Sequence, residues 1–246
     1  MFDLQKFRQI APDWGQRLHY HQELGSTNDE ALRLAAAGVA NFSVVLADHQ
    51  LAGRGRRGAP WLSESGAGLL FSLIFKPDYG KAVWSRLSLV SGLGIASVLQ
   101  EQWNLPAEVK WPNDVLVEDR KCCGILVETR QDYVVIGIGI NVTGSPGGEE
   151  SVAMNELTPH LGSREELLSE LLDSLQREVS SCDDSFTEQL TRLREMCYLS
   201  GKTITLNSRE EVFSGKMTGI SDDGALTLLT ESGSMNFTQA DTIRVV

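Results

Sequence analysis

The sequence GRGRRG at residues 53–58 is the stretch around which the rest of the chain is organised. It carries three arginines within four residues, interleaved with glycines, and it follows an apolar segment from Ser43 to Ala47. Glycine permits positive φ angles and a close approach of the backbone to a ligand. Arginine supplies planar, permanently charged donor groups that suit carboxylates and phosphates. The stretch therefore predicts a mobile cationic loop, at the end of a strand, that clamps an anion.

Two other interpretations of the hexapeptide stay open at this level. One is a solvated basic turn, and the other is an RNA-binding arginine-glycine tract, although such tracts usually repeat and contain aromatic residues. The stretch is neither a GxxxxGK[ST] phosphate loop nor a GxGxxG dinucleotide motif, because Arg57 precedes Gly58 and no suitable turn into a helix follows. The rest of the chain must therefore indicate which anion is bound.

Size and composition describe an ordinary globular protein and argue against some partners. The chain has 246 residues, of which 41% are hydrophobic and 22% charged, enough for one large domain or a medium domain plus a small one. Its net charge of −11 argues against binding duplex DNA through a broad basic face. No apolar run reaches the length of a membrane span, and the amino terminus lacks the apolar core of a signal peptide. We expect neither a DNA nor a membrane partner.

The cysteines indicate a reducing compartment. They have no CxxC spacing, which argues against a zinc knuckle and against a disulfide framework. The cytoplasm is therefore the expected location. The four positions are Cys122, Cys123, Cys182 and Cys197.

Apolar runs bounded by turn residues predict the strands of the first part of the chain. The predicted strands cover 17–23, 43–49, 68–76 and 133–141, together with a hairpin that pairs 115–117 with 123–127 through a turn at 118–120. The strand at 133–141 carries glycines two residues apart on one face, so a ligand or another backbone can approach it closely. It is either a free edge available for dimerisation or buried within one chain.

Helical spacing of apolar residues and capping signals predict the helices. The first predicted helix begins at the capping-box pair Thr27 and Glu30 and ends at Gly38. A second capping-box pair, Ser163 and Glu166, precedes the predicted helix at 167–179. The predicted helices after the first cover 87–103, 167–179 and 184–197. Ser26, Thr27 and Asn28 either cap their helix or also hydrogen-bond a polar ligand.

Beyond Leu199 the pattern changes to short strands joined by hairpin turns, at 203–207, 211–220, 225–229, 234–237 and 242–245. These strands predict a small β domain that depends on its larger neighbour for stability. We expect a domain at 1–198 and a second at 199–246, with an α+β fold overall.

The ordered set of motifs resembles the biotin–protein ligase family over nearly the whole chain. The matching pieces are STN at 26–28, Gln50 before AGRGRRG at 52–58, KWPND at 110–114, RKCCGILVE at 120–128 and GIGIN at 137–141. The resemblance implies a mixed β-sheet catalytic domain flanked by helices, similar to class II synthetases, followed by a small SH3-like β-barrel domain. Some members begin with a DNA-binding winged helix. About 25 residues precede Ser26 here, so the chain resembles the ligase-only class.

The resemblance implies a two-step reaction. The carboxylate of biotin attacks the α-phosphorus of ATP to give biotinyl-5′-AMP and pyrophosphate, with Mg²⁺ on the phosphates. A lysine of the biotin carboxyl carrier protein then attacks the activated acyl carbon and displaces AMP. Because the first step brings a carboxylate to a triphosphate, fixed positive charge must offset their repulsion. Arg54, Arg56 and Lys121 are the local candidates, and Lys121 is the expected contact to both the biotin carboxylate and the α-phosphate.

The family pattern also implies the remaining site residues. Trp61 resembles the tryptophan that closes over the adenylate, although an indole there could equally anchor the loop. Asp114 is expected to position nucleotide or metal and to assist acyl transfer, and Lys110 faces either phosphate or a local carboxylate. The full set of expected binding residues is Ser26, Thr27, Asn28, Gln50, Gly53, Arg54, Gly55, Arg56, Arg57, Trp61, Lys110, Asn113, Lys121, Gly124 and Asn141.

Two rival functions remain open. A lipoate– or octanoate–protein ligase shares the architecture and the acyl-transfer logic, but the arginine loop with KWPND resembles the biotin type. A non-catalytic sensor that holds biotin or its adenylate is the other rival, and the presence of Lys121 and Asp114 argues against it. A homodimer is compatible with the sequence.

Overall fold

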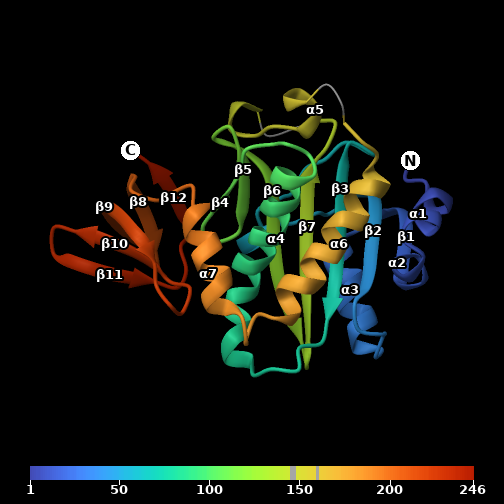
Figure 1. Cartoon of the computed structure of the whole chain (residues 1–246), viewed down its shortest axis with the longest axis horizontal. Coiled ribbons are helices and arrows are strands. Elements are labelled where there is room, and N and C mark those ends of the chain that lie inside the picture. The colour runs from blue at the N-terminus through green and yellow to red at the C-terminus, as the bar shows by residue number, and fades with distance from the viewer. Residues whose placement is uncertain (145–147, 159–160) are drawn as a thin grey trace.

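The computed structural model describes residues 1–144, 148–158 and 161–246, which form a large mixed-sheet part and a small β part side by side (Figure 1). The large sheet has seven strands in the order β1-β2-β3-β7-β6-β5-β4, and within it only β1 and β2 run parallel. This arrangement confirms the predicted α+β class. The strands are β1 (Leu18–Leu24), β2 (Ser43–Gln50), β3 (Gly68–Phe75), β7 (Tyr133–Asn141), β6 (Arg120–Arg130), β5 (Asp114–Val117) and β4 (Ala107–Lys110).

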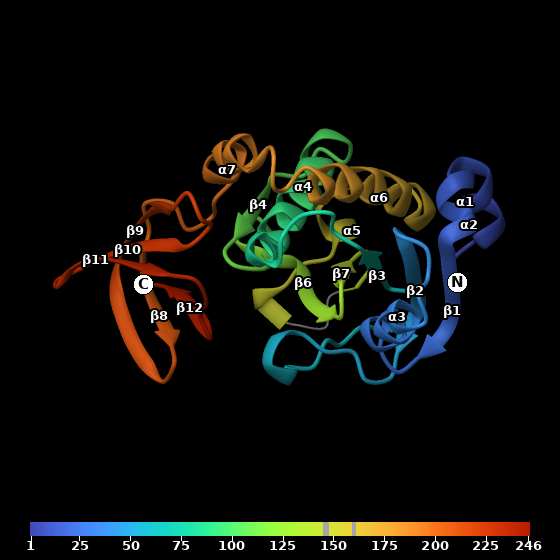
Figure 2. The same cartoon turned by 90° about the horizontal axis from the view of Figure 1, so that it is seen from below.

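The two faces of this sheet have different partners (Figure 2). Helices α4 (Leu87–Glu101) and α6 (Arg164–Ser180) cover one face, where alternate strand residues such as Leu46, Phe71 and Ile136 enter the main core. On the other face, α3 (Thr27–Ala36) packs on Val45 and on its neighbours in a smaller apolar cluster. The alternation of side chains along each strand explains this division. It leaves part of the second face, over β5 to β7, free of helices.

Helix α4 and the 3-10 turn η2 (Lys81–Arg86) form one apolar segment. Within the segment Lys81–Glu101, an 18-residue window has a mean hydropathy of 1.5, so by length and composition the segment could span a membrane, contrary to the expectation from sequence. However, 72% of that window is buried inside the fold, between the sheet and α6. Such burial is typical of a core helix.

Several local predictions can be compared with the structure. The capping box at Ser163 and Glu166 is confirmed at the start of α6. The capping box at Thr27 and Glu30 is wrong: Ser26 is the N-cap, Glu30 pairs with Arg33, and the Thr27 hydroxyl bonds elsewhere. The strand at 133–141 is β7 and lies between β3 and β6, so it offers no free edge.

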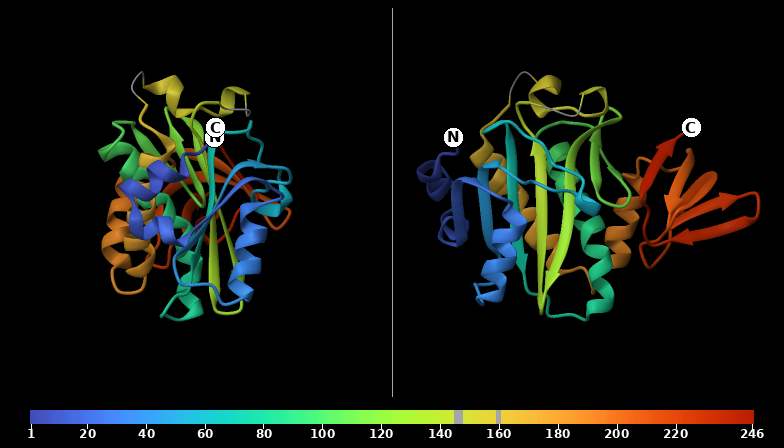
Figure 3. Two further views of the ribbon diagram at one scale, coloured as in Figure 1. Left: turned by 90° about the vertical axis from the view of Figure 1, so that its right-hand side faces the viewer. Right: turned by 180° about the vertical axis from the view of Figure 1, so that it is seen from behind.

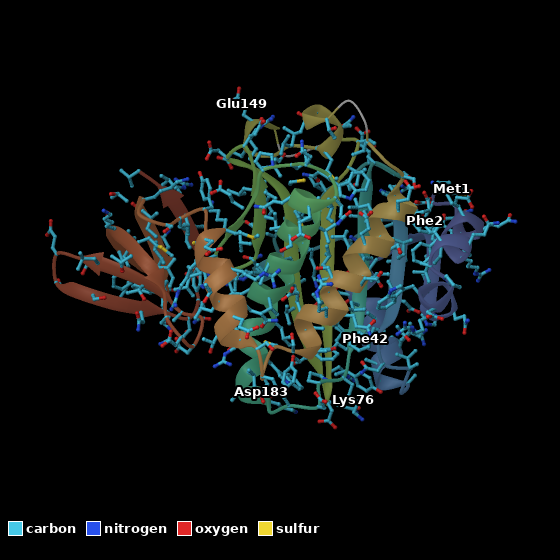
Figure 4. All side chains as sticks on the ribbon, in the orientation of Figure 1. Met1, Phe2, Phe42, Lys76, Glu149 and Asp183 are labelled. Atoms are coloured by element: carbon cyan, nitrogen blue, oxygen red, sulfur yellow. The ribbon has the colours of Figure 1, made fainter. Side chains whose placement is uncertain are left out.

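The amino terminus is fastened to the sheet. Helices α1 (Leu4–Ile10) and α2 (Pro12–Arg17) lie beside β1 and β2, and Phe2 is buried next to them (Figure 4). The backbone amide of Phe2 donates to both carboxylate oxygens of Asp48 at 3.1 Å. Asp48 also pairs with Arg164 of α6 at 2.9 Å and accepts a bond from the Tyr20 hydroxyl at 2.5 Å. One buried carboxylate therefore joins the amino terminus, β1 and α6.

The small part is an antiparallel sheet in the order β11-β10-β9-β8-β12. Its buried side chains, among them Ile204, Leu206 and Leu226, form its core. The predicted small β domain is confirmed, although its strands form an open sheet whose edges are β11 and β12. The predicted division at residues 198 and 199 stays a prediction. The strands are β8 (Thr203–Ser208), β9 (Glu211–Ile220), β10 (Leu226–Thr230), β11 (Gly233–Phe237) and β12 (Thr242–Val245).

Figure 3 shows the small part joined to one end of the large part through the connecting chain. Side chains also hold this junction. Arg194, in α7 (Phe186–Glu195), donates to the carbonyl of Ile220 at 2.6 Å and pairs with Asp222 at 3.0 Å. The indole of Trp111 donates to the carbonyl of Gly224 at 3.0 Å. A second contact, through the arginine loop, is described below. The remaining short elements are η1 (Arg56–Gly58), η3 (Gly148–Glu150) and α5 (Met154–Leu157).

Candidate active site

A pocket of about 220 Å³ lies on the sheet face opposite α4 and α6. Its walls are the start of α3, the arginine loop after β2 and the central part of β5 to β7. Most of the residues that the sequence predicts for the site line this pocket. They are Ser26, Thr27, Asn28, Gln50, Arg54, Gly55, Arg56, Trp61, Asn113, Asp114, Lys121 and Gly124.

One end of the pocket is a buried network of hydroxyl and amide groups. The Oε1 atom of Gln50 accepts from the backbone amide of Thr27 at 2.7 Å and from its hydroxyl at 3.0 Å. The hydroxyl of Ser72, in the centre of β3, lies 2.8 Å from the Thr27 hydroxyl and 2.6 Å from Asn28 Oδ1. Because Gln50 Oε1 already has two donors, the side chain presents its NH₂ group as the free hydrogen-bonding group. This end suits a ligand that carries a carbonyl oxygen.

Arg54 belongs to the same end, where it pairs with two carboxylates. Its guanidinium lies 2.7 Å from Asp29 and 3.0 Å from Glu128. The hydrogen bond to Asp29 and the contacts with Glu128 outweigh burial and raise the pKa of Arg54 above its usual value. The Glu128 carboxylate also accepts a hydrogen bond from the side-chain NH₂ group of Asn28 at 2.7 Å. The charge of Arg54 is therefore matched locally, and the residue fastens the first part of the loop to α3 and β6.

Trp61 lies on a floor made by paired glycines. Gly124 and Gly139 are opposite each other on β6 and β7. A Cβ atom on Gly139 would lie 2.4 Å from the indole, and one on Gly124 would lie 2.7 Å from it. Only glycine leaves room for the ring here. The indole Nε1 of Trp61 is buried and has no hydrogen-bond partner among the described residues, and Lys121 Nζ lies 5.5 Å from the ring centroid.

Lys121 and Arg56 bring positive charge to the other end of the pocket. Lys121 Nζ lies 2.7 Å from Asp114 Oδ1, across the β5–β6 hairpin. Arg56 donates to Asn113 Oδ1 at 3.2 Å, and Asn113 is fixed in turn by a bond to the carbonyl of Ile125 at 3.0 Å. Burial and the nearby Arg57 lower the pKa of Arg56, while Asp114 opposes that effect. Two cations thus face one carboxylate, which leaves a net positive charge for an anion.

Four predicted residues lie outside the pocket lining. Lys110 lies opposite Asp114 in the register of strands β4 and β5. The carbonyl of Gly53 accepts a hydrogen bond from the backbone amide of Trp61 at 2.9 Å. Asn141 is buried and donates to the carbonyls of Lys121 and Val152 at 3.4 and 3.3 Å, so it supports the Lys121 backbone. Arg57 points to the small domain. Their roles toward a ligand stay predictions.

The cysteines do not contribute a reactive thiol to this pocket. Cys122 and Cys123 are buried in β6 and line no part of it. Burial raises the pKa of the Cys122 thiol to about 12 and that of Cys123 well above its usual value. Both thiols are therefore protonated at neutral pH, as expected for packing residues.

Sequence reasoning missed Ser72, Asp29, Glu128, Gly139 and Asp241. Ser72 carried a signal, because it is the polar residue within the otherwise apolar stretch GLLFSLIF at 68–75. Gly139 carried one too, through its spacing with Gly137. Glu128 and Asp29 carried none, since only the fold brings them to Arg54.

The chain was compared with known families. Residues 22–141 match the model of the "Biotin/lipoate A/B protein ligase family", and residues 199–243 match that of the "Biotin protein ligase C terminal domain". The first model covers biotin and lipoate ligases alike. The description of the second names biotin protein ligases alone.

Similar proteins and structures extend over most of the chain. The "Bifunctional ligase/repressor BirA" of Bacillus subtilis is 30% identical over 92% of this chain and 74% of its own length. The "Biotin--[acetyl-CoA-carboxylase] ligase" of Paracoccus denitrificans is 33% identical over 85% and 92%. The structure of the biotin protein ligase from Aquifex aeolicus in complex with biotin and ATP superimposes with a TM-score of 0.83 at 30% identity, covering 93% of this chain and 99% of the other. The matched ranges include most of both sheets, and this chain belongs to the biotin–protein ligase family.

Proposed function

We propose that this chain activates biotin with ATP to biotinyl-5′-AMP and transfers the biotinyl group to a lysine of a biotin carboxyl carrier protein. The observation that carries the proposal is the polarity of the pocket. One end presents hydrogen-bonding groups for a neutral head group, and the other presents Lys121 and Arg56 for anions. A molecule with a ureido ring at one end and a carboxylate at the other fits this gradient.

The first step depends on the cationic end. The carboxylate oxygen attacks the α-phosphorus, and the bond to the bridging oxygen of pyrophosphate breaks. Lys121 would exchange part of its contact with Asp114 for the carboxylate and the α-phosphate, whose charge spreads in the transition state. Arg56 would hold the phosphates from the opposite wall. Arg54 is matched by Asp29 and Glu128, so we assign it to loop anchoring rather than to charge stabilisation.

The second step forms an amide at the activated acyl carbon and releases AMP. Asp114 is the carboxylate of the pocket nearest to Lys121, and it would accept the proton of the incoming lysine. Trp61 covers the glycine floor and would shield the mixed anhydride from water once the loop is closed.

Mg²⁺ is the metal that we propose for the phosphates. In the part of the chain that the structure describes, no cluster of three or more His, Cys, Asp or Glu side chains could hold a metal by itself. The donor set fits an ion that is held mostly by phosphate oxygens and water with one or two protein oxygens. Asp114 and Asn113 would supply these oxygens. When bound, Mg²⁺ would neutralise part of the phosphate charge.

We also propose a cytoplasmic location. All four cysteines are free and buried, as expected for a protein of a reducing compartment. The relatives' names support a carboxylase carrier domain as the acceptor, because the Paracoccus denitrificans protein is called a biotin--[acetyl-CoA-carboxylase] ligase.

Pyrophosphate exchange tests the proposal and separates it from lipoate ligation. Purified protein with Mg·ATP and labelled pyrophosphate should form labelled ATP when biotin is added and should remain at background with lipoate or octanoate. Addition of a biotin carboxyl carrier domain should then give a carrier whose mass has increased by one biotinyl group. Exchange driven by lipoate but not biotin would overturn the assignment, and biotin binding without exchange would indicate a sensor.

A further inference from the structure

The arginine loop has a second anchor, on the small domain. Arg56 donates to the backbone carbonyl of Ala240 at 3.1 Å. Arg57 forms an ion pair with the carboxylate of Asp241. Ala240 and Asp241 lie in the connection between β11 and β12, and Asp241 is itself part of the pocket lining. The two parts of the chain thus meet at the loop that would close the site.

This anchor point is rigid. The amide of Asp241 donates to the carbonyl of Asn207 in β8 at 2.7 Å, and Ala240 is 2% exposed. The connection is therefore tied to the middle of the small sheet. The arginine loop, in contrast, is rich in glycine, and an ordered glycine-rich loop loses much conformational entropy. A fixed carboxylate on a rigid segment lowers the free energy of one loop conformation.

The backbone of Arg57 supports the same conclusion. Its φ angle is 57°, in the left-handed region that glycine favours and other residues rarely adopt. Arg57 also lies next to Arg56, so the two guanidinium groups repel each other. The Asp241 carboxylate offsets both costs, because it holds Arg57 in this conformation and neutralises its charge. Arg56 is then left in the pocket with its own charge unpaired by a carboxylate.

We propose that Asp241 is a positioning residue for the reaction: by pairing with Arg57 it holds the arginine loop over the pocket and directs Arg56 toward the phosphates of the nucleotide. This inference rests on the proposed function for its catalytic consequence, whereas its structural part does not need activity. It assigns the small domain a role in the site, because the domain supplies the fixed end of the loop.

Limited trypsin digestion of the ligand-free protein tests the structural part. Trypsin cleaves after Arg54, Arg56 and Arg57, and mass spectrometry distinguishes these cuts from cuts in the small domain. Asp241→Asn should raise the cleavage rate within residues 54–57 by about two- to five-fold, the range expected for losing a partly exposed ion pair. Asp222→Asn is the matched control. It removes the other acidic side chain that joins the small domain to the large one, through Arg194, and should leave the rate unchanged.

A charge exchange and a kinetic measurement complete the test. Asp241→Arg should increase cleavage after Arg54, a site that every variant keeps. The double variant Arg57→Asp with Asp241→Arg restores an ion pair with its charges exchanged, and it should return cleavage at that site to within two-fold of the wild-type rate. In steady-state assays with the full chain, Asp241→Asn should raise KM for ATP by about two- to five-fold and change kcat by less than two-fold. If loop cleavage and KM for ATP in Asp241→Asn equal those of Asp222→Asn, the positioning role is wrong. If the wild-type chain shows no biotin-dependent pyrophosphate exchange, the proposed function is wrong. The digestion result then still shows whether Asp241 anchors the arginine loop.

Discussion

Lys121 illustrates how a single side chain depends on its surroundings. From sequence it could equally be an exposed lysine beyond a hairpin turn. In the structure the hairpin and the neighbouring glycine floor bring its ammonium group 2.7 Å from Asp114 and over the ring of Trp61. Asp114 orients the lysine before an anion arrives, so less reorganisation is needed in the reaction.

Replacing Lys121 should abolish most of the first step. We expect Lys121→Ala to lower the rate of biotin-dependent pyrophosphate exchange by about 10²- to 10³-fold, as for other preorganised charged donors. Lys81→Ala, which removes an exposed lysine paired with Asp132, should exchange at the wild-type rate. Exchange by Lys121→Ala close to that of Lys81→Ala would refute the assigned role.

Ser72 is a second residue whose effect should reach the ligand through its neighbours. Its hydroxyl contacts Thr27 and Asn28, and Thr27 in turn fixes Gln50. Ser72→Ala leaves these buried groups short of a partner, at about 1–3 kcal/mol. We therefore expect KM for biotin to rise by about 5- to 100-fold. The control is Ser91→Ala, a fully buried serine in α4 that bonds only its own helix at the Leu87 carbonyl. Equal KM values in the two variants would show that Ser72 is only a packing residue.

At the scale of elements, sequence reasoning located most strands and helices because local signals determine them. Strands β9 and β12 were predicted with their observed ends. Turn residues bound β9 on both sides and β12 on its amino-terminal side. The order of strands was not predictable in this way. Strand β6 directly precedes β7 in the chain, so whether β7 was an edge depended on its pairing with β3, which lies far away in sequence. The start of α3 was predicted with the wrong cap, because Thr27 makes its strongest bonds to Gln50 rather than within its helix.

The same limit applies to the site. The glycine spacing in β7 predicted that another group approaches this strand closely. It did not predict that this group is the Trp61 side chain. The sequence contained the loop arginines, yet their partners come from α3, β6 and the small domain. Charge matching by Asp29 and Glu128 separates Arg54 from Arg56, and no local pattern distinguishes these two arginines.

The amino-terminal helices, β2 and α6 depend on one carboxylate, which gives a pH prediction. Burial alone would raise the pKa of Asp48, but hydrogen bonds from Tyr20 and from the Phe2 amide, with the charge of Arg164, outweigh it and lower the pKa. A carboxyl with a lower pKa in the folded state stabilises the fold above its unfolded pKa of about 3.9. That stabilisation is lost as the pH falls through the lower folded value.

Asp48→Asn should therefore lower the free energy of unfolding at pH 7 by about 3–5 kcal/mol, as for a broken buried ion pair. The difference from the wild type should shrink as the pH falls from about 4 toward the lower pKa of the folded state, because Asp48 takes up a proton in the unfolded chain before it does so in the folded one. Urea unfolding at pH 7 and at pH 3 measures both values. Asp132→Asn, which breaks the exposed pair with Lys81, should change stability by about 1 kcal/mol or less at either pH. A difference for Asp48→Asn that is independent of pH would contradict the linkage.

At the scale of the whole molecule, the pocket is lined by both parts of the chain, because Asp241 of the small domain joins the residues of the large one. The large sheet supplies the floor and Lys121, α3 supplies the polar end, and the small domain supplies the fixed anchor of the arginine loop. A closed loop is then a property of both parts. A reactive adenylate needs this closure, because water that enters would hydrolyse the mixed anhydride.

Arg56 connects the two parts directly, since it bonds Asn113 on the large sheet side and Ala240 on the small one. Arg56→Gly removes both bonds and adds backbone freedom, so it should open the loop more than it weakens the initial binding of biotin. Loss of about 1.5–3 kcal/mol of charged hydrogen bonding corresponds to an adenylate half-life on the enzyme about 10- to 150-fold shorter. The measurement is to load the protein with biotin and Mg·ATP, remove free ligand by gel filtration and follow the retained adenylate over time. Arg209→Gly, which removes an exposed arginine of positive φ on the β8–β9 turn, should keep the wild-type half-life. Equal half-lives for Arg56→Gly and Arg209→Gly would mean that the adenylate is retained by contacts other than loop closure.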